Sequence, residues 1–230
     1  MRSKLRSLLR SVARLSVLAI FLAASGTASA ESLLERLFSG AGASSRVIEA
    51  SEAERAGFGW RLAEAAFQRT KARVLYDGAY QRIAYPMGDV APNRGVCSDV
   101  IVRSYRALGH DLQQLVHEDM RRAFHRYPQA WGLSRPDPNI DHRRVLNLER
   151  YFERRGARLP VSDDPADYRP GDLVTYRVGR NLPHIGIVST RLSADGKRPM
   201  VVHNIGAGPR LEDFLFAYPI VAHYRFAPEE

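Results

Sequence analysis

The 230-residue sequence contains a single cysteine, Cys97, and only three lysines among its 34 basic residues. One cysteine cannot form an intrachain disulfide, so the fold must be stabilised by its hydrophobic core. The sequence also lacks an apolar run long enough to span a membrane, and it lacks a Gly-x-Gly-x-x-Gly or phosphate-binding loop. These absences exclude a disulfide-stapled miniprotein and give no support to nucleotide binding.

The charge is basic overall but not concentrated. The formal net charge is +9, and five of the basic residues lie within the first thirty positions, which contain no acidic residue. Removing those five leaves 29 basic against 25 acidic residues, or +4. With 45% hydrophobic and 26% charged residues, the remainder is typical of a globular domain. The pattern does not indicate a nucleic-acid-binding protein.

Residues 1–30 have the three parts of a secretory signal peptide. A basic start is followed by the apolar run Leu15–Ala24 and then by small residues that end in Ala28-Ser29-Ala30. The apolar run is about half of what a membrane span requires, so we expect cleavage after Ala30 and no stable membrane anchor. The mature protein would be periplasmic or secreted, with a flexible lead-in over residues 31–50 and a single domain over residues 51–230.

Hydrophobic periodicity predicts helices first and strands afterwards. Apolar residues at helical spacing predict four helices, and alternating or β-branched runs predict four strands after Pro160. Asp111 with Gln114 resembles an N-terminal capping box, and Asp195-Gly196 predicts a hairpin turn. This order favours an α+β fold. The helices are expected at 52–72, 96–108, 111–124 and 139–156, and the strands at 173–178, 184–190, 200–205 and 220–226.

Cys97 lies at the predicted start of a helix. The N–H groups and dipole of a helix start stabilise a thiolate and lower the pKa of the thiol, which would favour a nucleophile. A buried cysteine that serves only in packing is the alternative. A nucleophilic cysteine needs a base, which is usually histidine.

Two of the seven histidines lie in the predicted strand region. His184 begins one strand and His203 lies in the next, so a hairpin would bring the two side chains together. Either histidine alone is more often an ordinary strand residue. Together with Cys97, they fit a base and the group that orients it.

Three motifs resemble the NlpC-type and CHAP branch of the papain-like cysteine peptidases. They are Gly95-Val96-Cys97-Ser98-Asp99-Val100, Tyr168-Arg169-Pro170-Gly171-Asp172-Leu173-Val174 and Pro183-His184-Ile185-Gly186-Ile187-Val188. More closely, residues 60–226 resemble domain-of-unknown-function family 1287. The motifs of that resemblance include Tyr85–Val90, His117–Met120, Asn139–Arg144, Asn147-Leu148 and Val201–Gly206.

The resemblance implies a papain-like fold with helices packed on an antiparallel sheet. It implies Cys97 as the nucleophile, His184 as the base and His203 as the orienting residue, with Asn204 as the alternative for that third role. Tyr85 would help to form the oxyanion hole. The predicted helices within residues 111–155 would be an insertion that borders the substrate groove.

The implied function is that of an exported thiol amidase or endopeptidase acting on cell-wall (peptidoglycan) peptides, without a cofactor and as a monomer. A non-catalytic envelope-binding module and a thiol acyltransferase remain as alternatives. Arg143 and Arg144 would bind an anionic group of the substrate, unless they form only a solvated helix start. A metal site at His117-Glu118-Asp119 is disfavoured, because adjacent helical residues point to different faces.

Overall fold

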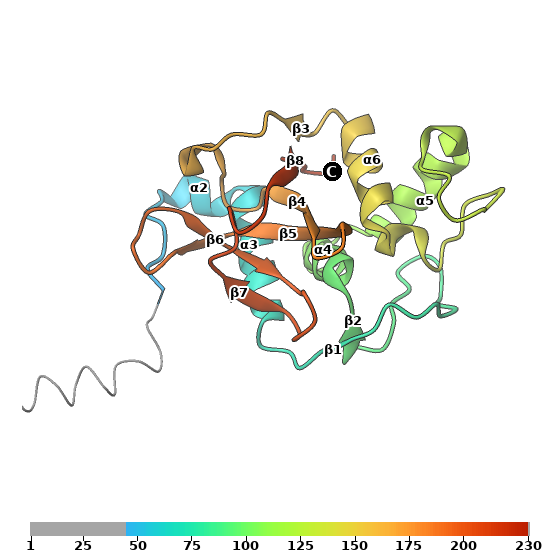
Figure 1. The fold of residues 1–230 in the computed structure, drawn as a ribbon, viewed down its shortest axis with the longest axis horizontal. Coiled ribbons are helices and arrows are strands. Elements are labelled where there is room, and N and C mark those ends of the chain that lie inside the picture. The colour runs from blue at the N-terminus through green and yellow to red at the C-terminus, as the bar shows by residue number, and fades with distance from the viewer. Residues whose placement is uncertain (1–44, 230) are drawn as a thin grey trace, which may run out of the picture. The chain divides into compact units, whose positions relative to one another are not determined.

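The computed structural model describes residues 45–229, which include a six-stranded sheet (Figure 1). The strand order is β3-β8-β4-β5-β6-β7, and every pairing is antiparallel. The sheet contains β3 (Arg158–Leu159), β4 (Leu173–Val178), β5 (Leu182–Leu192), β6 (Pro199–His203), β7 (Arg210–Glu212) and β8 (Ile220–Tyr224). A separate parallel pair joins β1 (Leu75–Tyr76) to β2 (Arg94–Gly95).

The predicted α+β fold is confirmed, and the helices precede the main sheet. The expected helix over 52–72 is two helices, α2 (Glu52–Ala56) and α3 (Phe58–Arg69). Gly57 separates them because its backbone is extended, with φ −61° and ψ 150°. Ser51 and Glu54 form a capping box that starts α2.

The remaining helices follow the predicted order. They are α4 (Cys97–Arg106), α5 (Leu112–Ala123), η1 (Phe124–Arg126), η2 (Asp141–Arg143), α6 (Val145–Arg154) and η3 (Pro165–Asp167). The capping box expected at the start of α5 does not form. The Asp111 side chain accepts from the backbone N–H of Gln113, whereas the Gln114 side chain bonds to Glu118.

Part of the expected lead-in is fixed to the sheet. The backbone N–H of Ile48 donates to the Thr190 carbonyl, and that of Leu192 donates to the Arg46 carbonyl, both at 2.8 Å. Residues 46–48 therefore run beside β5 and are not a flexible linker. The predicted signal peptide and the lead-in up to residue 44 lie outside the described residues.

Two hydrophobic clusters lie on opposite faces of the sheet. Helices α3, α4 and α6 pack against β5, and the first cluster fills this interface with residues such as Ile101, Phe152 and Ile187. The alternate residues of the strands, Val174 and Val188 among them, form the second cluster with Phe214 and Leu215 from the segment after β7. This alternation follows from the two-residue period of a strand.

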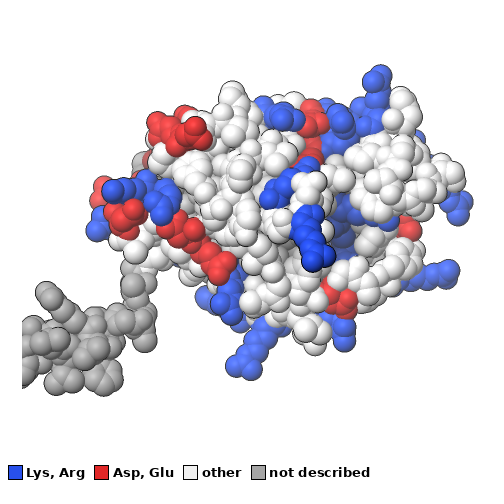
Figure 2. Space-filling model, in the orientation of Figure 1, with Lys and Arg blue, Asp and Glu red and all other residues white. Residues whose placement is uncertain are grey.

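The face of the molecule seen in Figure 2 does not carry a single field of one charge sign. Acidic and basic side chains are intermixed on the face shown in Figure 2. Within residues 45–229, no helix is long and apolar enough to cross a membrane.

Candidate active site

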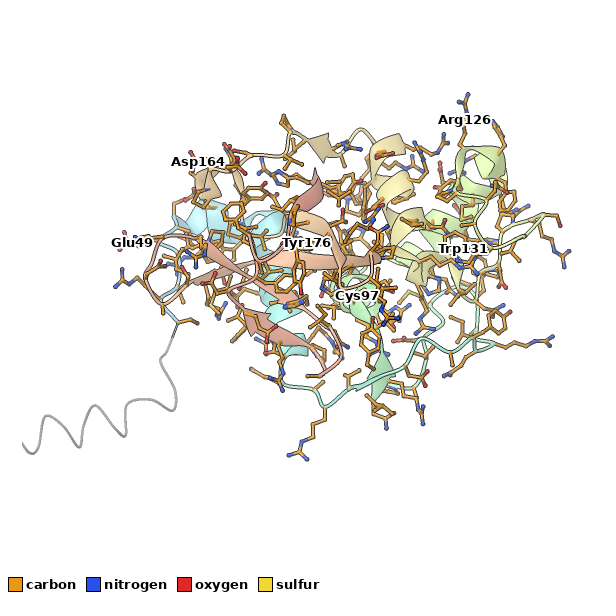
Figure 3. The ribbon with its side chains drawn as sticks, viewed as in Figure 1. Glu49, Cys97, Arg126, Trp131, Asp164 and Tyr176 are labelled. Atoms are coloured by element: carbon orange, nitrogen blue, oxygen red, sulfur yellow. The ribbon has the colours of Figure 1, made fainter. Side chains whose placement is uncertain are left out.

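Cys97 is the first residue of α4 and is 4% exposed. The parallel pairing of β1 with β2 places Tyr76 opposite Gly95, two residues before Cys97. Gly95 has a φ of +157°, and a Cβ there would lie 3.0 Å from Asp99 Oδ2, so the turn into α4 requires glycine. In the view of Figure 3, Cys97 lies at α4, below β5.

The thiol of Cys97 contacts the strand that carries His184. The backbone N–H of Ile185, which belongs to the peptide bond between His184 and Ile185, interacts with the sulfur. Burial raises the pKa of Cys97 to about 11, although the N–H groups of Ile185 and Ser98 act in the opposite direction. The expectation that the helix start lowers this pKa is therefore wrong, because desolvation outweighs the N–H groups.

His184 and His203 form a buried pair on neighbouring strands. His184 Nε2 lies 2.9 Å from His203 Nδ1, and the two side chains belong to residues that are 2% and 0% exposed. Gly186 allows this approach, because a Cβ at that position would lie 2.5 Å from Val201 Cγ1 and 3.3 Å from the Cβ of His203. Both rings pack on Phe214.

The environment keeps both imidazoles neutral at neutral pH. Burial, and secondarily the charge of His203, lowers the pKa of His184 to about 3. Burial lowers the pKa of His203 to about 4. A carboxylate oxygen of Glu212, on β7, lies 2.8 Å from His203 Nε2, close enough for an ion pair but not aligned as a hydrogen bond.

Tyr76 is a site residue that the sequence analysis did not identify. Its hydroxyl interacts with the Cys97 thiol, and burial together with this thiol raises the pKa of Tyr76 to about 12. The phenol therefore stays protonated and can donate a hydrogen bond. Tyr85, the tyrosine expected at this place, is 41% exposed, and its ring lies 5.0 Å from that of His117.

Arg143 is buried behind the start of α4. Its Nε donates to Asp99 Oδ1 at 2.8 Å and its Nη2 to Asp99 Oδ2 at 2.9 Å, while Asp99 also accepts from the backbone N–H of Val96. The hydroxyl of Ser98 donates to the carbonyl of Arg143 at 2.6 Å. Arg143 is 6% exposed, so the structure places it as a support for the Cys97 helix and not as a free anion-binding group.

Arg144 lies closer to solvent but is already paired. Its Nη1 is 3.0 Å from Asp141 Oδ1, and its guanidinium carbon is 4.1 Å from the ring centroid of Trp131. The side chains of Arg144 and Trp131 line a pocket of about 370 Å³, which also includes Val96, the residue before Cys97. Both arginines expected to bind substrate line this pocket, but Arg143 is buried and bound to Asp99, so Arg144 is the more accessible of the two.

The residues considered for a metal site have other partners. Asp119 pairs with Arg154 and accepts from the hydroxyl of Tyr127, and the His117 ring lies against Tyr85. Among residues 45–229, no three His, Cys, Asp or Glu side chains come together as a metal-binding group. Asn204, the alternative orienting residue, reaches back to the Gly95 carbonyl at 3.5 Å, whereas His203 contacts His184.

Two kinds of similarity connect the chain to other proteins. It is 51% identical over 165 residues to "Uncharacterized protein YijF" of Escherichia coli (strain K12), covering 72% of this chain and 80% of the relative. The solved structures of NlpC1 and NlpC2 from Trichomonas vaginalis are similar at TM-scores of 0.39 and 0.38, with 14% and 15% identity over 79% and 76% of this chain. The chain spans about half the length of those two structures, 46% and 48%.

The family comparison agrees with the resemblance read from the motifs. The model of "Domain of unknown function (DUF1287)" matches residues 63–226, a range that includes Cys97, His184 and His203. This match spans the whole candidate site and all six strands of the main sheet. The chain belongs to the DUF1287 family.

Proposed function

We propose that the protein is a cysteine hydrolase that cleaves amide bonds, with Cys97 as the nucleophile and His184 as the base. The observation that carries the proposal is the contact of the Cys97 sulfur with the His184–Ile185 peptide, beside a histidine pair joined through His184 Nε2. Because Nε2 is engaged by His203, Nδ1 of His184 is the nitrogen left for the thiol proton. In this proposal Cys97 supplies the nucleophile, His184 the base and His203 the group that orients the base.

The histidine pair favours one arrangement of protons. If His184 accepts the thiol proton at Nδ1, its own proton lies on Nε2 and is donated to His203 Nδ1. His203 then carries its proton on Nε2, the atom that faces the Glu212 carboxylate. Glu212 therefore stabilises the tautomer of His203 that can accept from His184.

Each proton in the reaction has a defined place. The thiol transfers its proton to His184 Nδ1 as the sulfur attacks the carbonyl carbon, and His184 then protonates the leaving amine. Water then attacks the resulting thioester and gives one proton to His184, which returns it to the departing sulfur, and the carboxylic acid that is released loses its proton to solvent. With the pKa of Cys97 near 11 and that of His184 near 3, the resting pair is neutral, so the proton moves only as attack proceeds.

The developing oxyanion would be bound by two donors. The N–H groups at the start of α4 face the Cys97 sulfur, and the protonated hydroxyl of Tyr76 lies beside it. Tyr76 takes the role that the family resemblance suggested for Tyr85. Preorganised donors of this kind stabilise a tetrahedral intermediate without reorganisation.

The proposed substrate is a peptide of the bacterial cell wall, and the proposed location is the periplasm or the cell exterior. The substrate class is supported by the NlpC-type motifs around Cys97 and His184. The location is supported by the signal-like sequence of residues 1–30, with cleavage after Ala30. N-terminal sequencing of the mature protein tests the location, and Glu31 is the expected first residue.

Turnover of purified peptidoglycan peptides tests the chemistry. Cys97→Ser and His184→Ala should each lower kcat by at least about 10³-fold, because the thiol and its base are lost. His125→Ala is the matched control, since His125 is exposed on η1 and should keep full activity. Mass spectrometry should find a thioester on Cys97 when an activated ester replaces the amide substrate.

Turnover that persists in Cys97→Ser would refute the nucleophile. An amide product formed when a second amine is added, with no free carboxylate, would make the protein an acyltransferase on the same residues. Absence of both products and of the thioester would leave the binding-module interpretation.

A further inference from the structure

A second pocket, of about 800 Å³, is lined by Tyr80 and by residues of α5 and of the loops on either side of it in sequence. Three arginines line it: Arg82 from the loop after β1, Arg121 from α5 and Arg135 from the loop after η1. We call this depression the arginine pocket. Tyr80 also lines the smaller pocket, which includes Val96, the residue before Cys97, so the two depressions adjoin at Tyr80.

The arginines of this pocket have no acidic partner among residues 45–229, in contrast to Arg103 and Arg143, which are paired with Asp89 and Asp99. All three are exposed. Three separate chain segments thus converge with their positive charges around one concave surface.

The one acidic side chain in the arginine pocket, Asp137, is already satisfied. It accepts from the Tyr80 hydroxyl at 3.0 Å and from the backbone and side-chain nitrogens of Asn139 at 2.9 and 2.7 Å. These bonds lower the pKa of Asp137 against the effect of burial, so it stays ionised. Three positive charges against one negative charge leave a net charge of +2 for an anionic ligand.

Other groups on the wall fit a peptide ligand. Leu133, Ile83 and Pro136 supply apolar surface, and the Nδ1 atom of His117 is buried without a hydrogen-bond partner in the described part of the chain. Burial and the nearby Arg121 lower the pKa of His117, so its ring is neutral at neutral pH and can donate or accept. Trp131, which lines the smaller pocket together with Tyr80, lies on the α5 side of Cys97 (Figure 3).

We propose that the arginine pocket binds a carboxylate of the peptide substrate, away from the bond that is cut. The proposal rests on the proposed function and specifies its substrate: a peptide with a free carboxylate that lies beyond Tyr80 when the scissile carbonyl is at Cys97. It replaces Arg143, which is buried, with Arg82, Arg121 and Arg135 as the anion-binding set. Guanidinium groups bind carboxylates through charge-assisted, often bidentate hydrogen bonds.

Equilibrium binding in the Cys97→Ser protein tests this assignment without turnover. The probe is one purified peptidoglycan tetrapeptide, used with its carboxylates free and again after chemical amidation, and binding is measured by calorimetry. The double variant R82Q/R121Q should bind the free acid about tenfold more weakly, and high salt should weaken binding to the parent but much less to the double variant. Arg122→Gln, next to Arg121 but outside the pocket, is the matched control and should bind like the parent.

The amidated peptide should bind weakly to all forms, with no difference between the parent and the double variant. Equal binding of the free and amidated peptides, or unchanged binding by the double variant, would overturn the assignment. Binding that depends on the arginines in a protein that hydrolyses nothing would refute the proposed function and leave this inference standing. Normal hydrolysis together with peptide binding that does not depend on the arginines would refute this inference and leave the proposed function standing.

Discussion

The two sides of the candidate site are held by different kinds of interaction. His184 and His203 project from β5 and β6, which pair through backbone hydrogen bonds within a six-stranded sheet. Cys97 begins a helix whose start is fixed by side chains, since Asp99 accepts from Val96 and from Arg143, and Ser98 donates to the Arg143 carbonyl. The histidine side is supported by many backbone contacts and the cysteine side by a few buried polar groups.

This difference predicts where the site is vulnerable. Backbone hydrogen bonds, and not a single side chain, join β5 to β6. A side-chain substitution on these strands should therefore change the chemistry of the site more than the position of the strands. On the cysteine side, one arginine joins η2 to α4 and also reaches the carbonyl groups of Asp77 and Ala79. Losing that arginine would release the helix start and the segment after Tyr76 together.

Arg143→Met should have the largest effect. It leaves the Asp99 carboxylate, 3% exposed, without its guanidinium partner, and breaking a buried pair in this way costs roughly 3–5 kcal/mol. Urea denaturation should show this loss in the free energy of unfolding. Arg150→Met is the matched control, because both side chains of the Arg150–Glu153 pair reach solvent, at 46% and 24% exposure, and it should cost about 1 kcal/mol or less.

A double variant shows how much of the lost stability comes from the unpaired charge of Asp99 and how much from the lost contacts of the Arg143 side chain. Asp99→Asn combined with Arg143→Met removes both charges and should recover part of the lost stability. If Arg143→Met lowers only substrate affinity and leaves unfolding unchanged, Arg143 is a substrate contact, as the sequence suggested, and the comparison between the two sides fails.

The histidine side was the more predictable from sequence. The strand expected at 173–178 matches β4, and the period-two pattern placed His184 and His203 on neighbouring strands. Alternation is a local signal, and a hairpin joins strands that follow each other in the chain. The same signal missed β3 and β7, which have two and three residues and are too short to show a period.

The cysteine side depends on contacts that no local pattern reveals. Arg143 meets Asp99 across 44 residues, and Tyr76 reaches Cys97 from a two-residue strand. No sequence motif indicates a role for Tyr76, and the sequence predicts Arg143 as part of a solvated or substrate-binding helix start. The sign of the Cys97 pKa shift was missed for the same reason: a helix start can be read from sequence, but its depth of burial depends on the tertiary structure.

His203→Ala should be the next largest perturbation, because it removes the partner of His184 Nε2. We expect kcat for peptidoglycan peptides to fall about 10²-fold, or about 2.7 kcal/mol in the activation barrier, as the base loses its orientation. His203→Asn, whose side-chain oxygen can accept from Nε2, should recover part of the loss. Equal activity of the alanine variant and the parent would show that His203 only packs against Phe214.

Acid should destabilise the protein through buried histidines, and His142 provides a test away from the histidine pair. Burial, and then the charge of Arg143, lowers the pKa of His142 to about 4 from an ordinary 6.5. The unfolded chain therefore binds more protons, so stability present above pH 6.5 is lost as the pH falls toward 4.

The lowered pKa of this histidine makes the free energy of unfolding about 2 kcal/mol smaller at pH 5 than at pH 7. His142→Gln should reduce the difference in unfolding free energy between pH 7 and pH 5 by about that amount, whatever it does to stability at pH 7. An unchanged pH dependence would mean that His142 titrates normally in the folded protein.

Tyr76→Phe should have the smallest effect, because it removes only one of the proposed oxyanion donors and leaves the N–H groups at the start of α4 in place. The variant keeps the ring and the pairing with Gly95, so unfolding should change little, while kcat should fall about tenfold, or about 1.4 kcal/mol, with KM nearly constant. A lower kcat with a nearly constant KM is the result expected for a donor that stabilises the transition state and not the bound substrate. Tyr85→Phe is the matched control and should leave kcat unchanged, because its ring lies against His117. A loss of kcat in Tyr85→Phe without one in Tyr76→Phe would return the oxyanion role to the tyrosine that the sequence motif indicated.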